Sequence, residues 1–112
     1  MIDVHFDKNC DKLIARISGE LDLVIADKFR TAVDQALDRG NCSKLILDLS
    51  RVTFIDSSGL GVILGRYKRL TPQGGVMAIV APQPQVEKIL EFSGIKRIIK
   101  LYASEKEALD EI

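Results

Sequence analysis

Hydrophobic and polar positions alternate at the start of the chain, and this alternation predicts a hairpin. Residues 2–7 place apolar side chains at every second position, and residues 12–18 do so again after a polar turn over residues 8–11. A period of two sends successive side chains to opposite faces of a strand. The chain is therefore expected to open with two antiparallel strands.

The pattern then changes to the period of a helix. Residues 25–39 carry apolar side chains at three- and four-residue spacing, and Gly40 ends the predicted helix. Residues 44–49 form a short run of branched apolar residues, interrupted by Asp48. Such a run is typical of a strand that is covered on both faces, as in a parallel sheet.

The second half of the chain repeats the change from strand to helix. Apolar residues 52–55 lead into a helix that reaches about Leu70, and a break rich in Gly and Pro follows at residues 71–75. Further elements are a strand over residues 76–80, a helix over 84–92, a strand over 98–101 and a helix capped by Ser104 in a capping box with Glu107.

The predicted order is therefore β-β-α-β-α-β-α-β-α. Strands that alternate with helices favour a mostly parallel sheet, to which the opening hairpin adds one antiparallel strand. We expect an α/β fold with a mixed sheet of about five strands and four α-helices. The sequence shows no internal repeat and no linker, so one domain over residues 1–112 is expected.

Composition indicates which broad class of protein this chain belongs to. Hydrophobic residues make up 46% of the chain and charged residues 29%, which is typical of an ordered globular protein. No apolar run reaches the ~18 residues of a membrane span, and the N-terminus lacks the features of a secretion signal. We therefore expect a cytoplasmic protein that does not bind membranes.

Charge argues against nucleic-acid binding. Residues 1–60 carry 8 basic and 10 acidic side chains, residues 61–112 carry 8 and 6, and the net charge is zero. This asymmetry is too small to attract a phosphate backbone. The densest basic groups are interpreted as solvated helix faces; they are Arg66, Lys68, Arg69, Lys96, Arg97 and Lys100.

The residues that other chemistries require are absent or misplaced. Cys10 and Cys42 lack the spacing of a zinc site and are expected to be unpaired thiols. The single histidine, His5, lies on the opening strand and is expected at the surface, where it forms no Ser-His pair. A dinucleotide fingerprint that begins at Gly59 would need its third glycine at position 64, which is Leu64.

Two loops are the best candidates for function. In parallel sheets, functional residues collect beyond the carboxyl ends of the strands, where loops lead into helices. The first loop, residues 19–22, contains Glu20 and Asp22. The second contains Asp56, Ser57 and Ser58 directly before a helix, and these are three candidate N-caps where one suffices.

The residues after Ser58 support a functional interpretation. Gly59 and Gly61 lie in the first helical turns, where each costs up to about 1 kcal/mol relative to alanine. Glycine at such positions suggests that another group approaches the backbone closely. A phosphate on either serine would be tolerated at the positive end of the helix dipole. Together with the nearby carboxylates it would repel a partner that docks through neutral contacts.

Phosphoryl transfer by the chain itself is an alternative. Asp22, Asp48 and Asp56 could hold a magnesium ion, as in a receiver domain. Two requirements of that fold are missing, because no acidic pair follows the first strand and no lysine ends residues 76–80. A small Asp-dependent phosphoryl-transfer enzyme therefore remains the less favoured hypothesis.

The sequence resembles the anti-sigma factor antagonists, a family built on the STAS domain. The resemblance covers nearly the whole chain and includes IARISGELD at residues 14–22 and SEKEAL at residues 104–109. Its most specific stretch is FIDSSGLGVILGRYK at residues 54–68, which is similar to the sporulation branch. One departure is Ile25 before Ala26, where the family commonly has Thr or Ser to cap the first helix.

The resemblance implies a function in partner switching. Such a protein binds an anti-sigma factor that is also a serine kinase, in its nucleotide-bound state, and so releases a sporulation sigma factor. The kinase uses ATP to phosphorylate the serine directly after the aspartate, which here is Ser57, and a serine phosphatase reverses the modification. The residues themselves do not distinguish Ser57 from Ser58.

The resemblance also implies that this chain is no enzyme, needs no cofactor and is a monomer when free. An antagonist of a general-stress module of the same family is the second possibility. The expected partner surface comprises the residues that the two loops and the following helix present: Glu20, Asp22, Asp56, Ser57, Ser58, Gly59 and Gly61.

Overall fold

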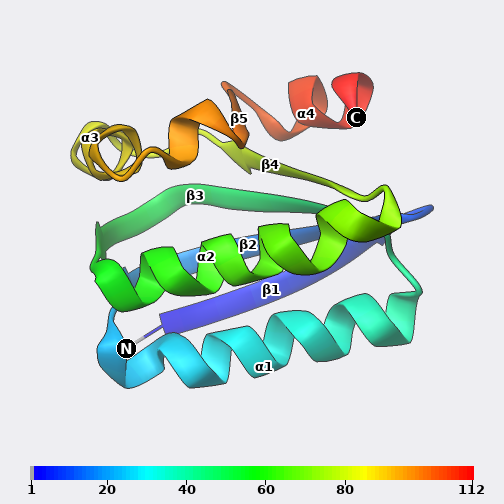
Figure 1. Cartoon of the computed structure of the whole chain (residues 1–112), viewed down its shortest axis with the longest axis horizontal. Helices are drawn as coiled ribbons and strands as arrows, with labels where there is room; N and C mark the ends of the chain where they lie inside the picture. Colours follow the sequence, from blue (N-terminus) through cyan, green and yellow to red (C-terminus); the bar gives the residue numbers. More distant parts are fainter. Residues whose placement is uncertain (1) are drawn as a thin grey trace.

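Five strands form one mixed sheet in the computed structural model of this protein, which describes residues 2–112 (Figure 1). The strands lie in the order β1-β2-β3-β4-β5. β1 and β2 are antiparallel, and every other neighbouring pair is parallel. Their bounds are β1 (Ile2–Asn9), β2 (Lys12–Leu21), β3 (Lys44–Ile55), β4 (Val76–Val80) and β5 (Lys100–Tyr102).

Within residues 2–112, four α-helices alternate with the strands from β2 onward. They are α1 (Leu23–Gly40), α2 (Ser57–Leu70), α3 (Pro84–Phe92) and α4 (Glu105–Glu111). The predicted fold class and order of elements are confirmed. The last strand begins at Lys100 and not at residue 98, because residues 95–97 form a 3₁₀ turn that the sequence pattern did not indicate.

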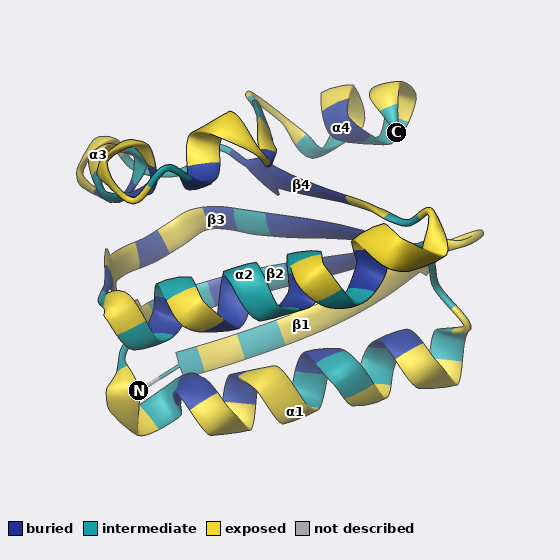
Figure 2. Ribbon diagram, in the orientation of Figure 1, coloured by how far each residue is buried: buried dark blue, intermediate teal, exposed yellow. Residues whose placement is uncertain are grey.

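Apolar residues cover both faces of the sheet, as the run at residues 44–49 predicted. Leu45 and Leu47 of β3 point into a large core with helices α1, α2 and α3. Ile46, between them, points to the opposite face, where α4 contributes Ala108 to a smaller apolar cluster. This division into two layers follows from the period of two along a strand (Figures 1 and 2).

The buried face of α2 includes a charged residue. Arg66 was expected on the solvated face, but it is buried, with an exposed fraction of 9%. The buried positions of α2 are Gly59, Val62, Ile63, Arg66 and Leu70. Arg66 is buried because α2 packs beside α1 as well as against the sheet, and Arg66 lies on the face toward α1.

Other expectations concern single residues. His5 is exposed on β1, as predicted. Cys10 is an exposed free thiol in the turn between β1 and β2, and Cys42 is a half-buried free thiol. Of the helices within residues 2–112, none combines the length and apolar character needed to cross a membrane.

Candidate functional site

The two candidate loops lie side by side because β2 and β3 are paired to their carboxyl ends. Leu21 is the partner of Ile55 in the parallel ladder. The chain leaves β2 through Asp22 into α1, and it leaves β3 through Asp56 into α2. The two helices therefore begin next to each other at one end of the sheet, where the start of α1 is exposed (Figure 2).

Asp56 connects the two loops through its side chain. Its Oδ1 accepts hydrogen bonds from the backbone N–H groups of Ser58, at 2.9 Å, and Gly59, at 3.1 Å, and so caps α2. Its Oδ2 accepts the N–H of Leu23, at 3.0 Å, from the first turn of α1. The Asp56 N–H also donates to the Leu21 carbonyl, at 3.2 Å. One residue thus fixes both helix starts.

Asp22 is the N-cap of α1. Its Oδ1 accepts the N–H of Ile25 at 3.2 Å, and α1 begins at Leu23, two residues before the expected start. Aspartate is as good an N-cap as serine or threonine. α1 is therefore capped by Asp22, although Ile25 has no hydroxyl group.

The two glycines of α2 have different surroundings. A methyl group at Gly59 would collide with the carbonyl oxygen of Leu21 and lie 2.8 Å from Cγ1 of Ile55. The group that approaches Gly59 is therefore the chain itself. A methyl group at Gly61 would meet nothing within 4 Å, and this residue is exposed.

The serines and Glu20 take different positions around this cap. Ser57 is exposed at the first position of α2. Ser58 is half-buried, and its N–H is engaged by Asp56. Glu20, near the end of β2, is exposed and pairs in register with Phe54. The first loop, expected over residues 19–22, is shorter than predicted, because β2 continues through Leu21 and includes Glu20. The other six residues of the expected partner surface lie at the starts of α1 and α2.

Three exposed apolar side chains at this end of the sheet were not predicted as site residues. Leu23 is 74% exposed and Val24 is 86% exposed at the start of α1, and Phe54 is 45% exposed near the end of β3. Exposed apolar side chains that gather in one patch are typical of protein interaction surfaces. The available signal was that Leu23 and Val24 precede the regular apolar stripe of residues 25–39, so the core does not need them.

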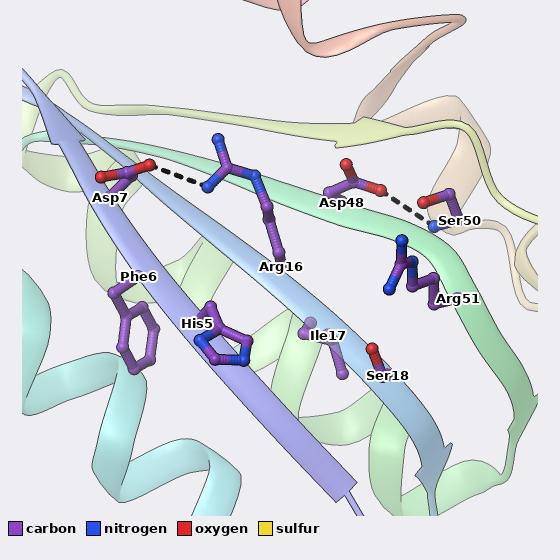
Figure 3. A pocket seen from close by; sticks show the side chains of 9 residues that line it. All are labelled: His5, Phe6, Asp7, Arg16, Ile17, Ser18, Asp48, Ser50 and Arg51. Atoms are coloured by element: carbon purple, nitrogen blue, oxygen red, sulfur yellow. Dashed lines mark hydrogen bonds and ion pairs between the residues drawn. The ribbon is translucent and has the colours of Figure 1, made fainter.

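A separate cavity is formed by other residues. It has a volume of about 510 Å³ and lies over β1, β2 and β3 (Figure 3). It contains Asp48, which the phosphoryl-transfer hypothesis grouped with Asp22 and Asp56. Asp48 lies eight residues before Asp56 on an extended strand, so these carboxylates are far apart. Within residues 2–112, no three metal-ligating side chains gather closely enough to hold a metal ion.

Ion pairs fill one side of this cavity. Arg16 donates to Glu105 of α4 at 2.8 and 2.9 Å and to Asp7 of β1 at 2.8 Å. The hydrogen bonds to Glu105 and then Asp7 raise the pKa of Arg16 above its ordinary value. Burial raises the pKa of Asp48, but hydrogen bonding with Glu105 and Ser50 and the charge of Arg16 together bring it below its ordinary value.

Known proteins are similar to this chain in sequence. The anti-sigma F factor antagonist of Paenibacillus polymyxa is 40% identical over 111 residues, which are 99% of this chain and 95% of that protein. The anti-sigma-B factor antagonist of Bacillus subtilis is 28% identical over 102 residues, with 91% and 92% covered.

Solved structures are similar to this chain in fold. The unphosphorylated anti-sigma factor antagonist SpoIIAA aligns with a TM-score of 0.84 and 30% identity over 96% of this chain and 94% of that chain. SpoIIAA of Bacillus in its phosphorylated form aligns with a TM-score of 0.76 and 29% identity, over 96% and 97%. The family model of the STAS domain matches residues 1–108. With its sequence matched almost end to end and its fold shared, the chain belongs to the STAS domain family.

Proposed function

We propose that this chain is an anti-sigma factor antagonist of a sporulation module, acting in the cytoplasm as a single domain over residues 1–112. One observation carries the proposal: Ser57 is exposed where α1 and α2 begin side by side. Leu23 and Val24 are exposed at the same place. A 40% identical relative named for the antagonism of an anti-sigma F factor supports the same function.

The proposed partner is an anti-sigma factor that is also a serine kinase, in its nucleotide-bound state. Leu23, Val24 and Phe54 would be covered by this partner, and full burial of such a side chain contributes about 1.5–3 kcal/mol. A few well-buried side chains carry most of the binding energy of a protein interface. Glu20, Asp22, Ser58 and Gly61 would form the polar and backbone surroundings of the contact.

Ser57 is the proposed phosphorylation site and Ser58 is not. Ser57 is exposed at the first helical position, whereas Ser58 is half-buried. Phosphorylation adds roughly −1.5 to −2 charges at neutral pH. Beside Asp56, Asp22 and Glu20, this charge would make the surface anionic and disfavour a partner that covers apolar side chains. A serine phosphatase would restore binding, and the similar protein SpoIIAA has been solved in both forms.

The geometry favours a binding module over an enzyme. Asp56 uses both carboxylate oxygens to accept backbone N–H groups, and Asp22 uses one to cap α1. These bonds hold the carboxylates in structural roles. In the proposed mechanism the kinase supplies ATP and the chemistry, while this chain supplies the serine hydroxyl and needs no cofactor.

Intact-mass spectrometry tests the proposal. The protein is incubated with ATP, magnesium and the anti-sigma F factor of Paenibacillus polymyxa. We expect one added phosphate on the wild type and on Ser58→Ala, and none on Ser57→Ala, because Ser57 is exposed and Ser58 is half-buried. The two variants are matched controls, since each removes one hydroxyl from the same turn.

Three other results would contradict the proposal. Phosphate on Ser57→Ala but not on Ser58→Ala would move the site by one residue. Phosphate transfer only with an anti-sigma-B factor would assign the chain to the second possibility, a general-stress module, and a 28% identical relative is named an anti-sigma-B factor antagonist. Sustained ATP hydrolysis by the isolated chain would identify an enzyme.

A further inference from the structure

Asp56 is the only side chain whose hydrogen bonds reach from the turn of Ser57 to α1, among residues 2–112. Leu23 and Asp56 are 33 residues apart in sequence, and the bond between them is 3.0 Å long. The Leu23 N–H lies at a helix N-terminus, where intrahelical partners are lacking. Its fixed position therefore depends on the carboxylate of Asp56.

The same carboxylate occupies the groups that a phosphate at Ser57 would seek. An anion on the first residue of a helix is attracted to the free N–H groups of the first turn. In α2, the N–H groups of Ser58 and Gly59 already donate to Oδ1 of Asp56. A phosphate and the Asp56 carboxylate would thus compete for one pair of donors, and their like charges would repel each other.

We infer that Asp56 is a positioning residue that transmits the phosphorylation of Ser57 to the first turn of α1. When the phosphate displaces the carboxylate, Asp56 releases the N–H of Leu23. The first turn of α1 then loses its link to α2, and with it the fixed placement of Leu23 and Val24. Phosphorylation would alter the apolar contact residues directly, in addition to adding charge. This inference rests on the proposed function, since it takes Ser57 as the modified residue.

Amide hydrogen exchange, measured residue by residue by NMR, tests the link in the isolated protein. Asp56→Asn keeps one carbonyl oxygen for the N–H groups of Ser58 and Gly59 but presents an NH₂ group to Leu23. We expect exchange at Leu23 to accelerate by roughly tenfold or more in this variant, as for the loss of a bond to a charged acceptor, while Ser58 and Gly59 remain protected. Asp22→Asn is the matched control, because asparagine caps α1 equally well and leaves Leu23 unchanged.

Phosphoserine placed at position 57 by codon suppression tests the transmission without any kinase. We expect it to accelerate exchange at Leu23 in the wild type and to have no further effect in Asp56→Asn. Equal acceleration in both backgrounds, or none in the wild type, would overturn the inference. So would unchanged protection of Leu23 in unmodified Asp56→Asn. None of these exchange measurements needs a partner protein. The link between Asp56 and Leu23 and the proposed function can therefore each fail without the other.

Discussion

Arg66 is a charged side chain in the interface between α1 and α2. Its Nε lies 3.1 Å from Oδ1 of Asp34, yet Nε and Nη1 are buried and form no hydrogen bond within residues 2–112. Burial lowers the pKa of Arg66, and the neighbouring charge of Asp34 opposes this change. Asp34 also accepts a hydrogen bond from Arg69 at 2.7 Å, so it does not depend on Arg66 for a partner.

Arg66→Met should therefore leave the free energy of unfolding unchanged or raise it by about 1 kcal/mol. The variant removes buried N–H groups that form no hydrogen bond and keeps most of the packing volume. Urea denaturation measures the change. Asp34→Asn is the control and should lower stability by roughly 1–3 kcal/mol, since it leaves the buried charge of Arg66 without a carboxylate, whereas Arg69 keeps its pair with Asp38. A large loss of stability in Arg66→Met would show that its ion pair with Asp34 is a net stabilising interaction.

At the residue scale, the sequence predicted functions for residues with local signals and missed those set by packing. Asp56 and Ser57 were identified because an excess of capping residues before a helix is visible in one short stretch. The partners of Asp56 were not, since Leu23 lies 33 residues away in sequence. Arg66 was misplaced because its burial depends on how α2 packs beside α1, which a pattern along α2 alone does not contain.

The start of α2 shows how one element is held against another. Gly59 contacts the end of β2 so closely that any side chain would collide with the Leu21 carbonyl, whereas Gly61 faces open space. The two glycines are two residues apart and cost the helix similar backbone entropy. They differ only in what surrounds them.

Alanine at each position separates the two roles. Gly59→Ala should lower the free energy of unfolding by roughly 1–3 kcal/mol, because the methyl group forces β2 and α2 apart. Gly61→Ala should raise it by up to about 1 kcal/mol through helix propensity. Thermal and urea denaturation of both variants provide the measurement. If both variants were stabilised, the close contact between Gly59 and Leu21 would be wrong.

At the element scale, the sequence pattern located every strand and α-helix, including β5, which has only three residues. Its errors lie at element ends. Asp22 starts α1 earlier than its apolar stripe indicates, because a cap acts outside the stripe. The turn at residues 95–97 was missed because a single 3₁₀ turn has no period to detect.

The whole molecule depends on polar contacts to hold its last helix. α4 is the only one of the four α-helices in the smaller apolar cluster. Arg16 joins it to the sheet by a double hydrogen bond to Glu105. Lys12 and Lys44 donate to carbonyl groups near its end, at 3.0 and 2.8 Å. Asp48 is the partner of Arg16 in the ladder between β2 and β3, so it belongs to the same charged group.

Acid should weaken this attachment. The pKa of Asp48 is lower in the folded protein than its ordinary value of 3.8, so the unfolded chain binds more protons between the two values. The stabilisation is complete above about pH 5 and is lost as the pH falls through the ordinary pKa toward the folded one. Urea denaturation between pH 7 and pH 3 should therefore show a smaller loss of stability in Asp48→Asn than in the wild type. Parallel curves would exclude this role.

The pairing of two loops at one end of the sheet has a consequence for how a kinase could recognise this chain. Ser57 lies beside the start of α1 only because β2 and β3 are in register, and Leu23 is 34 residues away in sequence. A linear peptide around Ser57 would contain the serine and the aspartate but neither Leu23 nor Val24. On the proposed function, the substrate is therefore the folded surface and not a sequence motif. An unfolded or newly synthesised chain would escape modification until its sheet has formed.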